Sequence, residues 1–257
     1  MLVVRRVSVA WGLSISLLLA GSACGSETAP SRAGGSVTVF AAASLTEAFT
    51  DIGTALGAGD PSLSVRYSFA GSGALVTQVD QGAPADVVAT ADTTSMARLV
   101  AAGLVETPTT FARNQLQILV PPGNPLGIAS LADLARPDLK VVLGDETVPA
   151  GKYAAQALQA AAVTVAPVSR EADVKAAVAK VTLGEADATI VYVTDVAAAG
   201  AKGQGVAIPD GQNVVAEYPI AVVKATGNHA GAVAFVDAVV HGSGQDALRQ
   251  RGFLPAA

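Results

Sequence analysis

The stretch "VTVFAAASLTEAF" (residues 37–49) joins a predicted strand to a predicted helix, and it decides how the rest of the chain is read. Apolar residues through Ala43 predict a strand, and apolar residues from Leu45 onward recur at helical spacing. The segment "SLTE" fits a capping box, in which Ser44 and Glu47 satisfy backbone donors reciprocally. Because the residues around Ser44 are small, we expect backbone N–H groups there to be accessible.

The same alternation of strand-like and helix-like stretches continues to the end of the chain. Further strands are predicted at "LSVRYSFA", "ADVVATA", "LQILVPP", "LKVVLGD", "ATIVYV" and "EYPIAVV", with helices between most of them and at the C-terminal end. Such alternation predicts an α/β protein with mostly parallel sheets flanked by helices. The prolines at 121, 122 and 125 and the stretch "EYPIAVV" are interpreted as two crossings between lobes. We therefore predict one lobe from 36–118 and 225–257 and a second from 119–224.

The N-terminal residues predict export. Arg5 and Arg6 precede a short apolar run, and small residues and Cys24 follow it. This order is typical of a secretory signal peptide over 1–24, and the run is short for a membrane span. The segment resembles a bacterial lipoprotein signal, which implies that Cys24 is lipidated and that 25–35 is a flexible tether; the alternative is ordinary cleavage that leaves a free thiol.

Composition argues against several other functions. Lys and Arg form no cluster in a chain of formal net charge -5, so a nucleic-acid surface is not expected. An enzyme could use Ser72 as nucleophile, but "AGSGA" lacks the Gly-x-Ser-x-Gly elbow. The two histidines, His229 and His241, lie far from it in sequence and are predicted to be surface residues. There is also no His/Cys cluster for a metal, so we predict no catalysis, no cofactor and no metal-ligating side chains.

Four strand-to-helix junctions are candidates for an anion site. They begin at Ser44, at Ser72, at "PAG" (149–151) and at "EADV" (171–174). A helix N-terminus carries about half a positive charge and free N–H donors, so it binds anions without a cationic side chain. Each junction alone is explained by helix capping; the four together, with the Tyr192 hydroxyl, indicate one oxyanion site.

At these residues the chain resembles the periplasmic molybdate-binding proteins of ABC transporters. The segments that carry the likeness are "VTVFAAASLTEAF", "FAGSGALVTQV", "GAPADVVATAD", "VPAGKYAAQAL", "EADVKAAV", "IVYVTD" and "EYPIAVV". The resemblance implies a two-lobed solute-binding fold with a ligand cleft between the lobes. It further implies that Ser44 and Ser72 bind the anion through hydroxyl and N–H groups, Ala150 and Val174 through N–H groups, and Tyr192 through its phenol.

The ligand implied by the resemblance is molybdate or tungstate, delivered by a lipid-anchored monomer outside the cytoplasmic membrane to a membrane permease. Hydrogen-bond donors alone suit a fully deprotonated anion, whereas a phosphate that keeps a proton needs an acceptor. Two alternatives stay open: the same fold specific for another tetrahedral oxyanion such as sulfate, and an oxyanion sensor.

Overall fold

The computed structural model describes residues 34–256, which form one compact unit. The predicted signal peptide, Cys24 and the tether up to residue 33 lie outside the described residues. The strands are β1 (Gly35–Ala42), β2 (Leu63–Ala70), β3 (Val87–Ala89), β4 (Thr109–Val120), β5 (Val141–Gly144), β6 (Ser169–Glu171), β7 (Ala188–Tyr192), β8 (Gln204–Ala207) and β9 (Val215–Val222).

The helices alternate with these strands, as the sequence predicts. They are α1 (Thr46–Gly59), α2 (Ser72–Asp80), α3 (Thr93–Ala101), α4 (Pro149–Ala160), α5 (Val174–Thr182), α6 (Val193–Ala199), α7 (His229–Val240) and α8 (Gly244–Gln250), with short 3₁₀ turns η1 (Ala43–Leu45), η2 (Leu131–Ala135) and η3 (Gly200–Lys202). Over the described part of the chain, no helix is both long and apolar enough to cross a bilayer.

The strands join in one mixed sheet in the order β2-β1-β3-β9-β4-β7-β5-β6, and β8 pairs with β4 at the side. This confirms the α/β class, but the expectation of mostly parallel sheets is corrected. The ladders β2-β1-β3 and β7-β5-β6 are parallel, whereas every ladder of β4 and β9 is antiparallel. The two central strands run against their neighbours because they carry the chain from one end of the sheet to the other.

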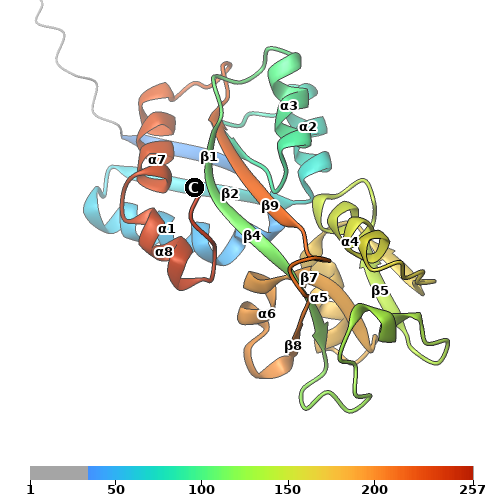
Figure 1. Ribbon diagram of the computed structural model, residues 1–257. Helices are drawn as coiled ribbons and strands as arrows, with labels where there is room; N and C mark the ends of the chain where they lie inside the picture. Colours follow the sequence, from blue (N-terminus) through green and yellow to red (C-terminus); the bar gives the residue numbers. More distant parts are fainter. Residues whose placement is uncertain (1–33, 257) are drawn as a thin grey trace, which may run out of the picture. The chain divides into compact units, whose positions relative to one another are not determined.

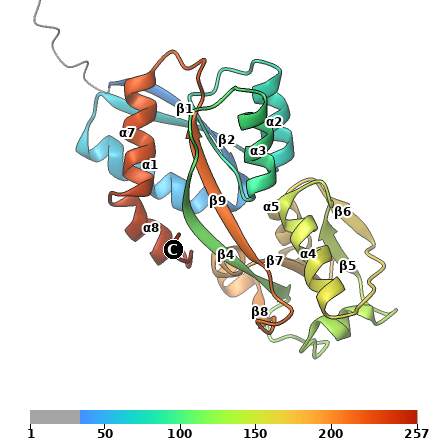
Figure 2. The same ribbon diagram turned by 45° about the horizontal axis from the view of Figure 1, so that its top comes forward.

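Strand β4 divides the sheet into two halves, which we call the first half (β1–β3 with α1–α3, α7 and α8) and the second half (β5–β7 with α4–α6). Residues 109–115 of β4 pair with β9, and residues 116–120 pair with β7 or β8. Figures 1 and 2 show β4 and β9 running side by side from one half to the other. The exact lobe boundaries at 118/119 and 224/225 stay a prediction.

Apolar residues on both faces of β1 explain why helices cover both sides of the first half. Val39 faces a cluster with Phe49 and Phe235 of α1 and α7, whereas Phe40 faces a cluster with Leu75 and Leu99 of α2 and α3. A strand buried on both faces reads as a continuous apolar run, as "VTVFAAA" does. The carboxyl end of β1 is thereby fixed at the junction where Ser44 lies.

A cavity at four helix starts

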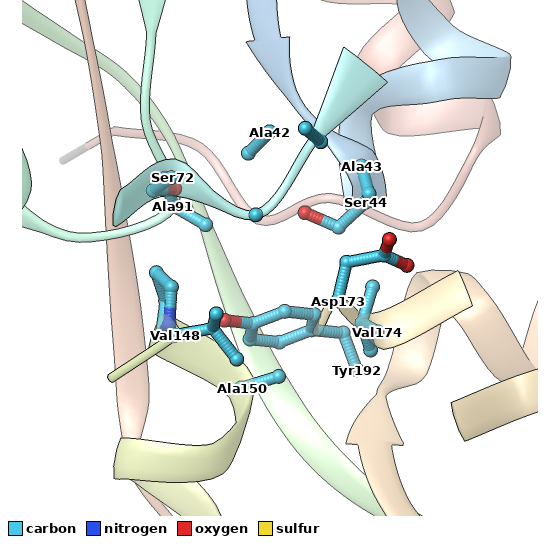
Figure 3. Close-up of a pocket in the computed structure, with 13 residues that line it drawn as sticks. Ala42, Ala43, Ser44, Ser72, Ala91, Val148, Ala150, Asp173, Val174 and Tyr192 are labelled. Atoms are coloured by element: carbon cyan, nitrogen blue, oxygen red, sulfur yellow. The ribbon is translucent and has the colours of Figure 1, made fainter. Parts of the chain in front are cut away.

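A small cavity of about 20 Å³ lies where helices of the two halves begin. Its lining comprises Ala42, Ala43, Ser44, Ala70, Gly71, Ser72, Ala91, Val148, Pro149, Ala150, Asp173, Val174 and Tyr192. All five residues predicted for the anion site are therefore brought together, three from the second half and two from the first. A cavity of this size has room for about one or two water-sized groups, so it suits a small ligand. Figure 3 shows the side chains converging on it.

Ser44 contributes a buried hydroxyl, but the predicted capping box is wrong. Ser44 lies inside η1, the N-cap residue of α1 is Leu45, and no side chain caps that helix. The Ser44 Oγ instead lies 3.0 Å from the Tyr218 Oη. Glu47 forms an ion pair with Lys175, 2.7 Å away. The 3₁₀ turn moves the N-cap position by one residue, from Ser44 to Leu45, so Ser44 and Glu47 no longer occupy the two positions that a capping box needs.

Ser72 begins α2 and is oriented by a backbone donor. Its side chain is 1% exposed, and its Oγ accepts a hydrogen bond from the Ala91 N–H at 3.1 Å. A serine hydroxyl that accepts one bond still has its own hydrogen to donate. Gly71, the N-cap residue, has no side chain with which to cap the helix, so the first N–H groups of α2 stay free for a ligand.

Ala150 and Val174 lie in the first turns of α4 and α5. The first helical hydrogen bond of α4 runs from the Lys152 N–H to the O of Val148, the residue before the helix. The N–H groups of Ala150 and Gly151 precede this bond and so have no partner within the helix. At α5, the Asp173 carboxylate caps the helix by accepting from Ala176 N–H at 2.9 Å. Because the Asp173 carboxylate accepts from Ala176 N–H and not from Val174 N–H, the Val174 N–H stays free at the cavity.

Gly151 explains why "PAG" opens α4. A Cβ at this position would lie 2.1 Å from Asp145 O and 2.4 Å from Gly144 O, both backbone atoms. Only glycine lets the first turn of α4 pack this closely onto the end of β5. The small residue at this junction therefore serves close packing of backbone on backbone.

Tyr192 supplies the most telling atom. The residue is 1% exposed and lines the cavity, and its Oη has no hydrogen-bond partner among the described residues. Burial raises the pKa of Tyr192 well above its usual value, so the phenol stays protonated and remains a donor. Buried polar atoms almost always have a partner, so an unpaired hydroxyl that lines a cavity is a donor that a bound group can use.

No Lys, Arg or His is among the residues that line this cavity. Two lysines in the first turns of α4 and α5 flank it, and each reaches across to the first half. Lys152 Nζ lies 2.8 Å from Thr94 Oγ1 and 3.8 Å from an Asp92 carboxylate oxygen. Lys152 thus joins the first turn of α4 to the start of α3 in the first half.

Lys175 forms the second contact between the halves. Its Nζ lies 2.7 Å from Glu47 of α1 and 3.1 Å from the fully buried carboxylate of Asp195 in α6. Burial acts to lower the pKa of Lys175, but the two carboxylates outweigh it and the pKa is raised. Burial raises the pKa of Asp195 to about 6, although Lys175 opposes the rise. Two polar contacts thus join the halves on either side of the cavity.

The histidines lie away from the cavity, and so give no support to an enzyme. His229 contacts Glu106 and His241 contacts Asp237, and both rings are largely exposed. Among the described residues, no group of three or more potential metal ligands comes together.

Sequence reasoning missed Tyr218 and Lys175. Tyr218 lies in "EYPIAVV", which was read only as a crossing strand, yet a tyrosine within a buried strand needs a partner for its hydroxyl. Lys175 gives no sequence signal, because its partner Glu47 lies 128 positions away.

Comparison with known proteins identifies the family. The family model for bacterial extracellular solute-binding proteins matches residues 37–254. The chain belongs to this family. Members of the family are described as extracellular binding proteins, in keeping with a cavity built for a small ligand.

Individual relatives agree with that assignment. The chain is 42% identical to the molybdate-binding protein ModA of Mycobacterium tuberculosis, over 97% of this chain and 98% of that protein. The solved sulfate-binding protein SubI of M. tuberculosis is 25% identical, with a TM-score of 0.74 and coverage of 86% of both chains. The periplasmic molybdate-binding protein of Azotobacter vinelandii shares the fold, with a TM-score of 0.75, 19% identity and coverage of 85% of this chain and 98% of that chain.

Proposed function

We propose that the protein captures molybdate, and tungstate with it, outside the cytoplasm and delivers the anion to an ABC transporter permease. The observation that carries the proposal is the orphaned Tyr192 Oη in a cavity where four helix starts converge. Hydroxyl and N–H donors, aided by the positive ends of helices, stabilise an anion without a cationic side chain. The close relationship to the mycobacterial molybdate-binding protein supports molybdate as the ligand.

Ser44 and Ser72 are proposed to bind the anion from the first half, and Ala150, Val174 and Tyr192 from the second. A ligand held from both sides favours closure of two lobes around it. The lobes are the predicted ones, and β4 and β9 are the segments that would act as the hinge between them. The protein is proposed to be a monomeric transport component without catalytic activity.

The donor-rich lining favours anions that carry no proton. The single carboxylate side chain in the lining, Asp173, is engaged in capping α5. Hydrogen phosphate would therefore present its proton to a site of donors, and its binding should be weak. Sulfate carries no proton either, and the likeness to SubI makes it the second candidate. Sulfate is smaller than molybdate, so the donors would fit it less closely.

Calorimetric titration of the purified full-length chain with molybdate, tungstate, sulfate and phosphate tests this proposal. We expect micromolar or tighter binding of molybdate and tungstate, much weaker binding of sulfate and negligible binding of phosphate. If sulfate binds more tightly than molybdate, the second candidate is correct.

Membrane attachment through a lipid on Cys24 is a separate proposal that rests on the sequence pattern alone. Fractionation of cells tests it: the wild-type chain should sediment with membranes, and a Cys24→Ala chain should not.

A further inference from the structure

Tyr218 lies directly behind the cavity, at the centre of the sheet. It is fully buried in β9, the strand that joins the two halves. Three aromatic rings meet it edge-on: Phe111 at 6.3 Å, Tyr192 at 5.9 Å and Phe253 at 5.3 Å between ring centroids. These contacts fix the ring, and so they also fix the position of its hydroxyl.

The hydroxyl of Tyr218 contacts one residue of the proposed anion site. Its Oη lies 3.0 Å from the Ser44 Oγ, which is also buried. Geometry alone permits either oxygen to be the donor in this pair. The direction matters, because it decides where the Ser44 hydrogen points.

The chemistry of the proposed ligand sets the direction. Burial raises the pKa of Tyr218 above its usual value, so the phenol keeps its proton and has a hydrogen to donate. A serine hydroxyl has one hydrogen, and a fully deprotonated anion can only accept hydrogen bonds. When Ser44 donates its hydrogen to such an anion, its oxygen is left to accept from the Tyr218 phenol.

Ser44 Oγ then accepts from Tyr218 and keeps its own hydrogen free. Figure 3 shows the Ser44 hydroxyl directed toward the space between Ser72 and Tyr192. A serine in a first helical turn otherwise tends to donate to a nearby backbone carbonyl. In the described part of the chain the Ser44 hydroxyl makes no such bond, and its partner is the Tyr218 hydroxyl.

We propose that Tyr218 is a positioning residue for the anion site: it donates to Ser44 Oγ and thereby directs the Ser44 hydrogen into the cavity. The proposal rests on the proposed function. Tyr218 does not line the cavity, so it acts through Ser44 and not by contact with the anion.

A double-mutant cycle on molybdate affinity tests this. Tyr218→Phe removes only the hydroxyl, and we expect the Kd to rise about 5- to 10-fold, as for one lost hydrogen bond. Ser44→Ala should raise the Kd by more. If Tyr218 acts through Ser44, the double variant should bind about as weakly as Ser44→Ala alone, whereas a merely structural role would make the two effects add.

Tyr67→Phe is the matched control. Tyr67 is also a largely buried tyrosine of the first half, and its hydroxyl donates to Phe49 O, far from the cavity lining. Its loss should change the thermal stability but leave the molybdate affinity within about 2-fold.

A measurement on the wild type covers the case in which Tyr218→Phe fails to fold. In protein labelled at tyrosine, the Tyr218 hydroxyl proton should exchange slowly with water, and its NMR signal should shift when molybdate is added. Three results would each overturn the inference while leaving the proposed function intact. They are an NMR signal of Tyr218 that does not shift when molybdate binds, additive effects of the two substitutions on the Kd, and a Tyr218→Phe variant with unchanged molybdate affinity when Ser44→Ala binds more weakly. A wild type that binds no molybdate would overturn both.

Discussion

Replacing Tyr192 with Phe should change affinity and stability in opposite directions. The Tyr192 Oη is buried without a hydrogen-bond partner among the described residues, and it is proposed to donate to the bound anion. A hydrogen bond to a charged group contributes about 1.5–3 kcal/mol. The variant should therefore bind molybdate about 10- to 140-fold more weakly, since 1.4 kcal/mol is a factor of ten.

The ligand-free protein should instead become more stable. A buried hydroxyl without a partner costs about 1–3 kcal/mol, and the variant removes it. The cavity of about 20 Å³ has room for a water molecule, which relieves part of this cost. We therefore expect the free energy of unfolding of the ligand-free variant to increase by about 1 kcal/mol, the lower end of this range. Such an increase raises the Tm by about 2–4 °C in a domain of this size.

Thermal unfolding and calorimetry, each with and without molybdate, measure both effects. The control is Tyr218→Phe, which removes a hydroxyl that does have a partner and so should not raise the Tm of the ligand-free protein. Unchanged molybdate affinity of Tyr192→Phe, or a lower Tm without ligand, would refute the reasoning.

Two further predictions concern closure and pH. A Cβ at Gly71 would lie 2.6 Å from Ala172 O of the second half, whereas ordinary contact begins at 3.4 Å. Gly71→Ala should therefore hold the halves about 0.8 Å (3.4 minus 2.6) further apart and weaken molybdate binding at least about 10-fold, because donors that retreat this far leave hydrogen-bond range. The control is Gly82→Ala, at an open site with positive φ, which should affect stability only; equal affinity losses in the two variants would contradict the closure argument. Burial raises the pKa of Asp195 from 3.8 to about 6, so the folded wild type takes up a proton as the pH falls through 6. Its free energy of unfolding, relative to that of Asp195→Asn, should therefore rise by about 1 kcal/mol when the pH is lowered from 8 to 5. Urea unfolding at the two pH values measures this difference, and no difference between them would show that Asp195 stays charged over this range.

The sequence predicts the fold well where the signal is local. Apolar runs such as "VTVFAAA" and helical spacing from Leu45 onward need only neighbouring residues, and the strands and helices lie close to their predicted positions. The antiparallel pairing of β4 and β9 was missed, because pairing between residues 109–120 and 215–222 is not encoded in either stretch alone.

The candidate site divides in the same way. The junctions at Ser72, "PAG" and "EADV" could be placed because small residues after a strand mark accessible helix starts. The resemblance to molybdate-binding proteins implied Ala150 and Val174 within them, and Ser72, Ala150 and Val174 all line the cavity. The predicted capping box at Ser44 was wrong, because both of its side chains have distant partners. Ser44 contacts Tyr218, 174 positions away, and Glu47 contacts Lys175, 128 positions away. Contacts of that range depend on tertiary packing.

Anomalous diffraction at the molybdenum edge, from crystals of the protein grown with molybdate, tests the central claim most directly. The account predicts one strong peak in the cavity, with anion oxygens within about 3 Å of the Ser44 and Ser72 Oγ atoms and the Tyr192 Oη. A peak elsewhere, or an anion held by lysine side chains in place of hydroxyl and backbone donors, would contradict it.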